Sequence, residues 1–578
     1  MIIATMSPFR NKKFVIAVAV MIVLLAAAVR LYKLGSIPVA LYIDEVAMLA
    51  DVKSVLATGH DIHGNNWYQL IYPSYGDYKL PVYIWLVTAV SSVIGASDFS
   101  LRLVSALAGI GTVIIAGLLA KELAIYFSNS NKHKLISSVF PLATMFVVAI
   151  SPWSVMFSRT GFEGHLAQFF VWLSIYLILT SKKRRWLFIL GVLFGVLSVY
   201  TYYSVRFVWP VIFVSTLLLQ LWYEPTKHKL ARLFSFIAKI VLGLLLLFVF
   251  LMPLEKSPYF VASEQLRMST DSIISFERYS DIVIRSNDLI KQSGATLVDR
   301  LIFHRYFLWL KDLSLNYSRN LSFDFLFFSG DSNLRHGTGA HGVFLLAFLP
   351  FLLIGLISLL REKPVLATAL FIMILAALLP ASVPMTTPHA LRSINALVPF
   401  SVYIGYGIAI FVNSLITLYE YHREKVIFLS ILALMIVIFT AFDFFHYYFV
   451  IYPKSSSKSW FACEQKLQQL ISSRDHSQVL ALLNSPKNFF LWYLAYSDIN
   501  LKFLEGKKSR EDSQSYLSIK NIVFDSSISE LNKDYKQEII FKGIYLSQIE
   551  DKGIILTSIR PINSEEKGCD YMLAQTQP

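Results

Sequence analysis

The sequence predicts an all-α, polytopic membrane protein followed by a small C-terminal α/β domain outside the cytoplasm. Of its 578 residues, 55% are hydrophobic and only 16% are charged, whereas soluble globular domains average about 25% charged residues. The mean hydropathy is +0.56, and the cores of soluble domains cannot hide so much apolar surface. An ordinary soluble enzyme is therefore excluded.

Eleven apolar runs approach the roughly 20 residues that a helix needs to cross a bilayer. They cover residues 14–31, 103–120, 135–150, 166–180, 186–200, 207–222, 233–251, 343–360, 365–380, 394–415 and 426–442. A twelfth run, at residues 82–94, is shorter. Whether it crosses decides the orientation of every later span.

Clusters of basic residues indicate that the run at residues 82–94 does not cross. Lysine and arginine collect in cytoplasmic loops, and all six clusters are cytoplasmic if this run is a re-entrant or interfacial helix. The clusters are Arg10/Lys12/Lys13, Lys121/Lys132/Lys134, residues 182–185, Lys227/Lys229/Arg232, Arg361/Lys363 and Arg423/Lys425. Topology thus explains the net charge of +14, and no nucleic-acid partner is expected.

This orientation places long segments outside the cytoplasm. A transmembrane domain at residues 1–446 contains the first outer loop (35–100) and a large outer loop (253–342), and a C-terminal domain follows at 447–578. The N-terminal run continues into Arg30 without a small-residue cleavage site, which indicates a retained anchor. The spans are nearly free of charge and no internal repeat is apparent, which disfavours a transporter.

Alternating patterns predict the α/β character of the C-terminal domain. Strand-like pieces occupy residues 478–483, 521–524 and 553–556, and helix-like polar stretches occupy 464–472 and 509–518. Cys463 and Cys569 are the only cysteines, too few and too far apart for a zinc motif. They bracket the domain in a non-reducing compartment, where a disulfide could close it.

The first outer loop carries the first candidate residues for chemistry. Asp44 and Glu45 are adjacent carboxylates just after the first span, which could act as a general base or as metal ligands. Alternatively, Asp44 caps a solvated helix. Lys79 stands beside aromatic residues at the mouth of the short apolar run, where it could meet a lipid phosphate or snorkel toward the interface.

The second outer loop contains Arg159 and Glu163, four residues apart. At that spacing the two could simply pair with each other. Alternatively, Glu163 supplies a second acid that faces Asp44. A divalent cation held by these two acids is an open alternative, because carboxylates are the oxygen ligands that such ions prefer.

The fourth and fifth outer loops carry positive charge. A glycine-rich segment in the fourth loop contains Arg335 and His336, and the fifth loop contains His389 and Arg392. Glycine lets a backbone approach an anion closely, and arginine with histidine supplies the charge. Arg392 could also be a juxtamembrane anchor. Loops that a helical bundle brings together in this way suit a reaction on a lipid-linked phosphate.

The order of these motifs resembles the GT-C glycosyltransferases, more narrowly the bacterial branch related to protein O-mannosyltransferases and aminoarabinose lipid A transferases. The motifs are Asp44-Glu45, Lys79-x-Pro-x-Tyr-x-Trp85 with an added Leu80, Leu101 to Gly109, Ser151-Pro-Trp153 and Ser158-Arg159. The similarity covers about residues 10–450. It implies that Asp44 activates the acceptor, that Lys79 lies near the lipid phosphate, and that Glu163 is the second-loop acid.

The residues and the resemblance together imply an inverting glycosyltransferase in the bacterial cytoplasmic membrane. It would move a monosaccharide from a polyprenyl-phosphate donor to a hydroxyl of a lipid, glycan or protein at the extracytoplasmic face, with no nucleotide site. Asp44 and Glu163 would be catalytic. Substrates would be bound by Glu45, Lys79, Arg159, Arg335, His336, His389 and Arg392. Two alternatives are an oligosaccharyltransferase or glycan ligase with a lipid pyrophosphate donor, and a transporter of lipid-linked glycans.

Overall fold

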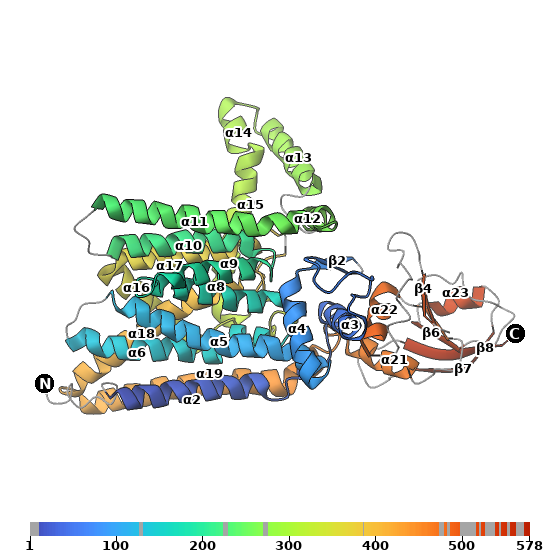
Figure 1. The fold of residues 1–578 in the computed structure, drawn as a ribbon, viewed down its shortest axis with the longest axis horizontal. Helices are drawn as coiled ribbons and strands as arrows, with labels where there is room; N and C mark the ends of the chain where they lie inside the picture. Colours follow the sequence, from blue (N-terminus) through green and yellow to red (C-terminus); the bar gives the residue numbers. More distant parts are fainter. Residues whose placement is uncertain are drawn as a thin grey trace. The chain divides into compact units, whose positions relative to one another are not determined.

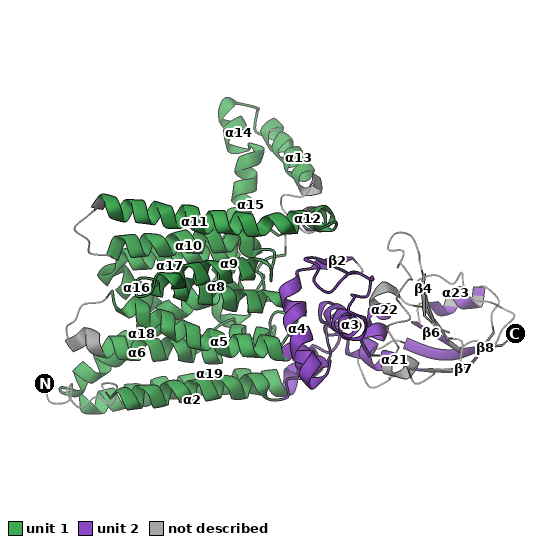
Figure 2. Ribbon diagram, viewed as in Figure 1, with its two compact units in different colours: residues 1–32, 103–449 green, residues 33–102, 450–578 purple. Residues whose placement is uncertain are grey.

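The computed structural model describes most of the chain, which forms two compact units (Figure 2). The described residues are 11–74, 76–126, 131–223, 229–269, 276–384, 386–472, 479–482, 486–496, 516–519, 522–525, 538–542, 545–551, 555–561 and 571–577. Unit 1 comprises residues 1–32 and 103–449, and unit 2 comprises residues 33–102 and 450–578. The first outer loop therefore shares a unit with the C-terminal region, a grouping that the sequence patterns do not predict.

Long helices that lie side by side form the bundle of unit 1 (Figure 1). Each of the eleven apolar runs overlaps one of them. These helices are α2 (Lys12–Leu31), α5 (Asp98–Ala124, which enters unit 1 at residue 103), α6 (Asn131–Ile150), α8 (Glu163–Thr180), α9 (Trp186–Val199), α10 (Val205–Tyr223), α11 (Lys229–Glu255), α16 (Leu349–Glu362), α17 (Pro364–Ser382), α18 (Leu397–Tyr419) and α19 (Arg423–His446). The predicted mostly helical, polytopic fold is confirmed.

Among the described residues, seven helices are long and apolar enough to cross a membrane. An eighth span results if α6 and α7 (Pro152–Ser158), which meet at a 56° bend, count as one. The predicted spans on α8, α9 and α16 are helical but lie outside this set. With 14 residues each, α9 and α16 extend about 21 Å at a rise of about 1.5 Å per residue, less than a hydrocarbon core of about 30 Å.

The large outer loop of unit 1 is helical. It contains α12 (Phe260–Ser269), α13 (Phe276–Gln292), α14 (Leu297–Ile302) and α15 (Arg305–Asn320), and α13 to α15 stand out from the bundle in Figure 1. Helix α15 then packs along α17. The buried amide of Asn316 donates to the carbonyl oxygens of Ser382 and Pro384, and Asn320, one turn later, donates to Ala381 O at 3.3 Å. These bonds fix the end of α17, where the fifth outer loop begins.

The first outer loop in unit 2 consists of a helix, a hairpin and a second helix. These elements are α3 (Ile43–Thr58), β1 (Tyr72–Ser74), β2 (Asp77–Lys79) and α4 (Pro81–Ile94). Gly76 has a φ of 89° in the tight hairpin turn, a conformation that glycine adopts without strain. Helix α4 has 14 residues and a length of about 21 Å, as α9 and α16 do, so length alone does not distinguish a span from a re-entrant or interfacial helix, and the latter stays a prediction.

The C-terminal part of unit 2 combines helices with a mixed sheet. The helices are α20 (Tyr452–Ser455), α21 (Ala462–Ser472), α22 (Pro486–Tyr496) and α23 (Leu546–Asp551), and the strands are β3 (Val479–Leu482), β4 (Tyr516–Ile519), β5 (Ile522–Asp525), β6 (Glu538–Lys542), β7 (Ile555–Pro561) and β8 (Tyr571–Gln577). The strand order is β4-β5-β3-β6-β8-β7, with β3 parallel to both of its neighbours. Helix α22 packs on α3, which joins this part to the first outer loop.

Two C-terminal predictions have different outcomes. The end of the helix-like stretch at 509–518 was wrong, because residues 516–519 form β4, where they pair with β5 in an antiparallel ladder; residues 509–515 lie outside the described part. Cys463 is disulfide-bonded, in agreement with the expected bridge. Cys569, the other cysteine of the sequence, lies outside the described residues.

Candidate active site

The adjacent acids Asp44 and Glu45 at the start of α3 have different environments. Glu45 is fully buried, and Arg102 binds both of its oxygens, with Nε 3.1 Å from Oε1 and Nη2 3.3 Å from Oε2. The backbone N–H of Tyr42 donates to Oε2 at 2.9 Å as part of a capping box. Because its carboxylate is buried and paired with Arg102, Glu45 stabilises the fold at the start of α3. This environment does not support the predicted contact with substrate.

Arg102 uses its remaining donors to bind the backbone that precedes α3. Its Nη1 donates to Pro38 O at 2.8 Å, and its Nη2 donates to Ala40 O at 2.6 Å. A buried guanidinium is tolerated when such hydrogen bonds satisfy it. Arg102 therefore ties α5 to the segment that carries Asp44. This explains physically why an arginine follows Leu101 in the motif singled out above.

Asp44 lies in the first turn of α3, one residue before Glu45, and its side chain is 34% exposed. The Nζ atom of Lys79 lies 3.0 Å from Asp44 Oδ1 and 2.6 Å from Asp77 Oδ2. Lys79 ends β2 and is almost completely buried. Unit 2 thus presents a partly exposed carboxylate at a helix N-terminus, where the helix dipole favours negative charge.

Asp77 is a charged neighbour of Lys79 that the sequence analysis missed. The two are two residues apart in β2, so they share one face of the strand. The pattern Asp-x-Lys directly after Gly76 could have identified the pair. The ammonium group lies between these two carboxylates. Since Glu163 belongs to the other unit, a cation shared by Asp44 and Glu163 stays a prediction.

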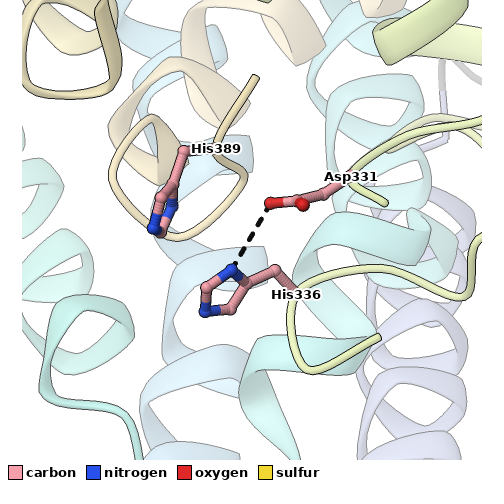
Figure 3. A group of neighbouring side chains, drawn as sticks. All are labelled: Asp331, His336 and His389. Atoms are coloured by element: carbon pink, nitrogen blue, oxygen red, sulfur yellow. Dashed lines mark ion pairs between the residues drawn. The ribbon is translucent and has the colours of Figure 1, made fainter. Parts of the chain in front are cut away.

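In unit 1, the fourth and fifth outer loops bring Asp331, His336 and His389 together (Figure 3). One potential ligand atom from each side chain lies within 4.8 Å of the others. The two imidazole rings have centroids 4.5 Å apart, and His336 Nδ1 lies 3.4 Å from Asp331 Oδ2. The prediction that His336 and His389 meet is thus supported by the geometry, whereas Asp331 was missed among the polar residues of its loop.

Backbone and side-chain hydrogen bonds hold the fifth loop in place beside this cluster. Ala390 N donates to Asp331 Oδ2 at 2.9 Å, and the buried indole of Trp153 on α7 donates to Ala390 O at 2.8 Å. His389 N donates to Asn320 Oδ1 at 3.3 Å. Residues of the second, fourth and fifth loops and of α15 therefore build one site within unit 1.

The surroundings of the cluster are electropositive. Burial lowers the pKa of His389 well below its ordinary value, and the positive charges of His336, Arg392 and Arg335 lower it further. The imidazole of His389 is therefore neutral near pH 7. Arg335 and Arg392, predicted to hold a phosphate, both lie close enough to act electrostatically on this ring. An anion is the ligand that two guanidinium groups favour.

The glycines of the fourth loop serve the folding of the loop itself. A Cβ atom on Gly330, whose φ is 71°, would lie 2.5 Å from His341 O, and one on Gly337 would lie 2.4 Å from Asp331 O. No side chain fits at such distances. The prediction that these glycines allow an approach to an anion is therefore revised: they allow the loop backbone to fold closely against itself beside Asp331 and His341.

Arg159 and Glu163 lie at the ends of neighbouring helices in unit 1. The buried guanidinium of Arg159 donates from Nη1 to Val29 O and Arg30 O, both at 2.9 Å, at the C-terminal end of α2. It also lies 5.0 Å from the centre of the Phe449 ring. These contacts give Arg159 a structural role. Glu163 is 9% exposed in the first turn of α8, and its catalytic role stays a prediction.

A buried polar network also explains the other motif residues. Arg30 donates five hydrogen bonds, to Ser158 Oγ, Ser154 Oγ and three carbonyl oxygens. A Cβ on Gly109 would lie 2.1 Å from Ser158 Oγ, so only glycine fits opposite this serine. Ser105 bridges Phe157 O and His165 Nδ1. These motif residues hold α2, α5 and α7 together, and Arg30 was missed because its partners lie far away in sequence.

Solved structures match this fold, although no family model and no curated protein matches the sequence. ArnT from Cupriavidus metallidurans bound to undecaprenyl phosphate matches with a TM-score of 0.52 and 11% identity, over 96% of this chain and 97% of that chain; its apo state gives 0.50 over the same shares. AglB from Archaeoglobus fulgidus, in complex with an inhibitory peptide and a dolichol-phosphate, gives 0.50 and 11% identity over 93% and 70%. The chain has the fold of these GT-C membrane glycosyltransferases.

Proposed function

We propose that this protein is an inverting glycosyltransferase that uses a polyprenyl-phosphate sugar as its donor. The ion pair between Asp44 and Lys79 carries the proposal, because it sets a partly exposed carboxylate beside an ammonium group in a chain with the GT-C fold. The fold supports the donor class: the ArnT structure holds undecaprenyl phosphate and the AglB structure holds a dolichol-phosphate, both of them polyprenyl phosphates.

Asp44 acts as the general base in this proposal. The acceptor hydroxyl oxygen attacks the anomeric carbon of the sugar and forms the new glycosidic bond, while its proton passes to an Asp44 carboxylate oxygen. The bond between the anomeric carbon and the phosphate oxygen breaks at the same time, and its electron pair leaves with the phosphate. A single displacement of this kind inverts the configuration of the sugar.

Positive charge assists the departure of the phosphate. The donor phosphodiester carries one negative charge and the released polyprenyl phosphate approaches two, so cations bind the transition state more strongly than the donor. Lys79 supplies such a charge in unit 2. Arg335 and Arg392 supply two more in unit 1, around the neutral ring of His389. We propose that Lys79 in unit 2 and, independently of it, Arg335 and Arg392 in unit 1 are phosphate-binding side chains.

The topology that fits this function has eleven spans and an outer active site. The eleven helices found at the predicted runs would all cross, with α4 lying re-entrant or interfacial, and the basic clusters would then all be cytoplasmic. Asp44, Lys79 and the C-terminal sheet would face the outside of the bacterial cytoplasmic membrane. Alkaline phosphatase fused after Tyr452 should be active and fused after Arg185 inactive, whereas the reverse pattern would contradict this orientation.

Comparison of cells with and without the protein tests the activity. Mass spectrometry of envelope lipids, glycans and proteins should show one glycosylated product lost in deletion cells, together with accumulation of a polyprenyl-phosphate monosaccharide. The wild-type gene should restore the product, and an Asp44→Asn gene expressed at the same membrane level should not. A product that returns fully with the Asn variant would remove Asp44 from the mechanism.

The second candidate is an oligosaccharyltransferase or glycan ligase with a lipid pyrophosphate donor. The likeness to AglB favours it, although the chain covers 70% of AglB against 97% of ArnT. Deletion cells would then accumulate a lipid pyrophosphate with an oligosaccharide rather than a monosaccharide. Loss of a transporter would instead leave the lipid-linked glycan on the cytoplasmic side, and the protein itself would form no glycosidic bond. The identity of the accumulated lipid and the side on which it accumulates therefore distinguish all three functions.

A further inference from the structure

The side chains of Asp331, His336 and His389 form a set of donors typical of a transition-metal site. We propose that these three residues bind one divalent transition-metal ion, with zinc the ion that best fits two imidazoles and one carboxylate. The two loops that supply the ligands belong to the same unit, and Figure 3 shows the three side chains converging on one space. This metal site is distinct from the cation predicted earlier at Asp44 and Glu163.

The spacing of the ligand atoms fits a metal better than a hydrogen bond. Bond lengths of about 2.0–2.1 Å in a tetrahedral site place neighbouring ligand atoms about 3.4 Å apart. His336 Nδ1 lies 3.4 Å from Asp331 Oδ2. Although it is buried, this nitrogen makes no hydrogen bond with any described residue. A buried imidazole nitrogen without a hydrogen bond is unfavourable unless another ligand satisfies it, and a metal ion would do so.

Neighbouring residues that are not ligands hold the ligand side chains in position, as metal sites require. Asp331 Oδ1 accepts a hydrogen bond from Asn333 N, and Oδ2 accepts one from Ala390 N, both at 2.9 Å. A carboxylate oxygen has two lone pairs, so Oδ2 can bind an ion and keep that bond. The ring of His336 also packs against the rings of Phe157 and Phe162, each with a centroid distance of 6.1 Å. These contacts position two of the three ligands before an ion arrives.

His389 completes the set with one ring nitrogen. Its Nδ1 accepts a long hydrogen bond of 3.3 Å from Arg392 N. An ion bound at Nδ1 replaces that bond, whereas an ion bound at Nε2 requires the proton to move to Nδ1. Either change is local to the ring. The three ligand atoms lie within 4.8 Å of one another, so the widest pair has to approach by at most about 1.4 Å to reach the tetrahedral spacing of about 3.4 Å.

The nearby arginines indicate what occupies the fourth position of the ion. One carboxylate and two neutral imidazoles leave a divalent ion with a net positive charge, and Arg335 and Arg392 add to the positive field. An anion is therefore favoured as the fourth ligand, because it neutralises this charge. A phosphate oxygen of the polyprenyl-phosphate donor suits this position. Only this last assignment rests on the proposed function; the three protein ligands do not depend on it.

Metal binding by the purified protein tests the proposal. Full-length protein in detergent is treated with a chelator and titrated with Co²⁺, whose visible absorption reports coordination by imidazole and carboxylate. One equivalent should bind to the wild type, and His336→Ala and His389→Ala should each weaken binding at least tenfold. His341→Ala is the matched control, because His341 lies in the same loop but pairs with Asp443 on α19 at 3.0 Å.

A second measurement protects the test against misfolded variants. An ion that binds only the folded state raises its unfolding temperature, so Zn²⁺ should stabilise the chelated wild type and Mg²⁺ should not. The proposal is overturned if neither Co²⁺ nor Zn²⁺ binds the wild type, or if His336→Ala and His389→Ala bind Co²⁺ as the wild type does. Donor and acceptor are absent from both measurements, so a negative result would leave the proposed glycosyl transfer unaffected.

Discussion

Lys79 lies 3.0 Å from Asp44, so two residues singled out for different roles form one ion pair. Asp44 begins a helix and Lys79 ends a strand, and the hairpin between them returns the chain to the helix N-terminus. Asp77 lies 2.6 Å from the same ammonium group. One ammonium group is therefore shared by two carboxylates, and the roles of these three residues can be separated by substitution.

Asp44→Asn should lower the transfer rate by about 10²–10⁴-fold, because a general base contributes about that much and the amide cannot accept the proton. The rate is measured in membrane vesicles supplied with the polyprenyl-phosphate sugar that accumulates in deletion cells. Asp77→Asn is the matched control, since it removes the other carboxylate of Lys79 and leaves Asp44 intact. Equal losses in the two variants would point to the charge of the pair rather than to a base at Asp44.

Lys79→Met should raise the donor KM and lower kcat, with kcat/KM falling on the order of 10–100-fold, because a charge that favours the leaving phosphate is lost. Lys79→Arg keeps the charge and should recover part of the activity. Donor titrations of the two variants in the same vesicles provide the values. A donor dependence in Lys79→Met that matches the wild type would support simple snorkelling, the alternative reading of this lysine.

Apolar run length predicted the helices well, because a bilayer imposes that length on any span. All eleven runs overlap helices, but α8, α9 and α16 are not among the described helices that are long and apolar enough to cross a membrane. The alternation of apolar and polar residues predicted the secondary structure of the C-terminal domain less well. Residues 516–519 form a strand through pairing with β5, a tertiary contact that overrides the helix-like composition of the preceding residues.

The candidate site was predictable where charged residues flank an apolar run in the sequence, as at Asp44 and Lys79. It was not predictable where the partner is distant in sequence. Arg159 binds carbonyl oxygens of Val29 and Arg30, and nothing in its own loop indicates this role. Asp331 shares its loop with many polar residues, and only folding brings Ala390 N to its carboxylate.

Glu45→Gln should destabilise the protein by about 3–5 kcal/mol, the loss typical of a buried ion pair that loses one partner. Arg102 would keep its charge in a fully buried site and lose the carboxylate that it binds directly. Thermal unfolding of the purified protein measures the loss. Adding Arg102→Met should restore part of the stability, because the uncompensated charge is gone. A single Gln variant as stable as the wild type would show that the carboxylate is not needed in the fold.

Asp51→Asn should stabilise the protein more at pH 8 than at pH 5. Asp51 on α3 is buried with no hydrogen bond to its Oδ2 from the described residues, and burial together with the charge of Asp61 raises its pKa well above the usual value. The folded state therefore binds this proton more tightly than the unfolded state, so the wild type loses stability as pH rises through that pKa. Asparagine cannot ionise and avoids the loss.

Thermal unfolding of the wild type and Asp51→Asn at the two pH values gives the comparison. Asp61 is the matched position for a control, because its carboxylate accepts hydrogen bonds from His63 N, Asn65 and Gln69. Asp61→Asn should destabilise at both pH values, since the amide nitrogen cannot accept these bonds. A stability difference between wild type and Asp51→Asn that does not change with pH would mean that Asp51 ionises alike in both states.

Trp153→Phe should loosen the fifth outer loop without unfolding the bundle. The substitution keeps an aromatic ring among Phe325 and Phe344, which contact Trp153 edge to face, and removes the indole N–H that donates to Ala390 O. A buried carbonyl that loses its donor costs about 1–3 kcal/mol.

Because Ala390 N also binds Asp331, the effect should reach the residues that flank His389. Hydrogen exchange of residues 386–396 should therefore become faster while exchange in α18 stays unchanged, and transfer activity should fall through a higher donor KM. Unchanged exchange in the loop would show that Trp153 only fills space and that other contacts hold the fifth loop.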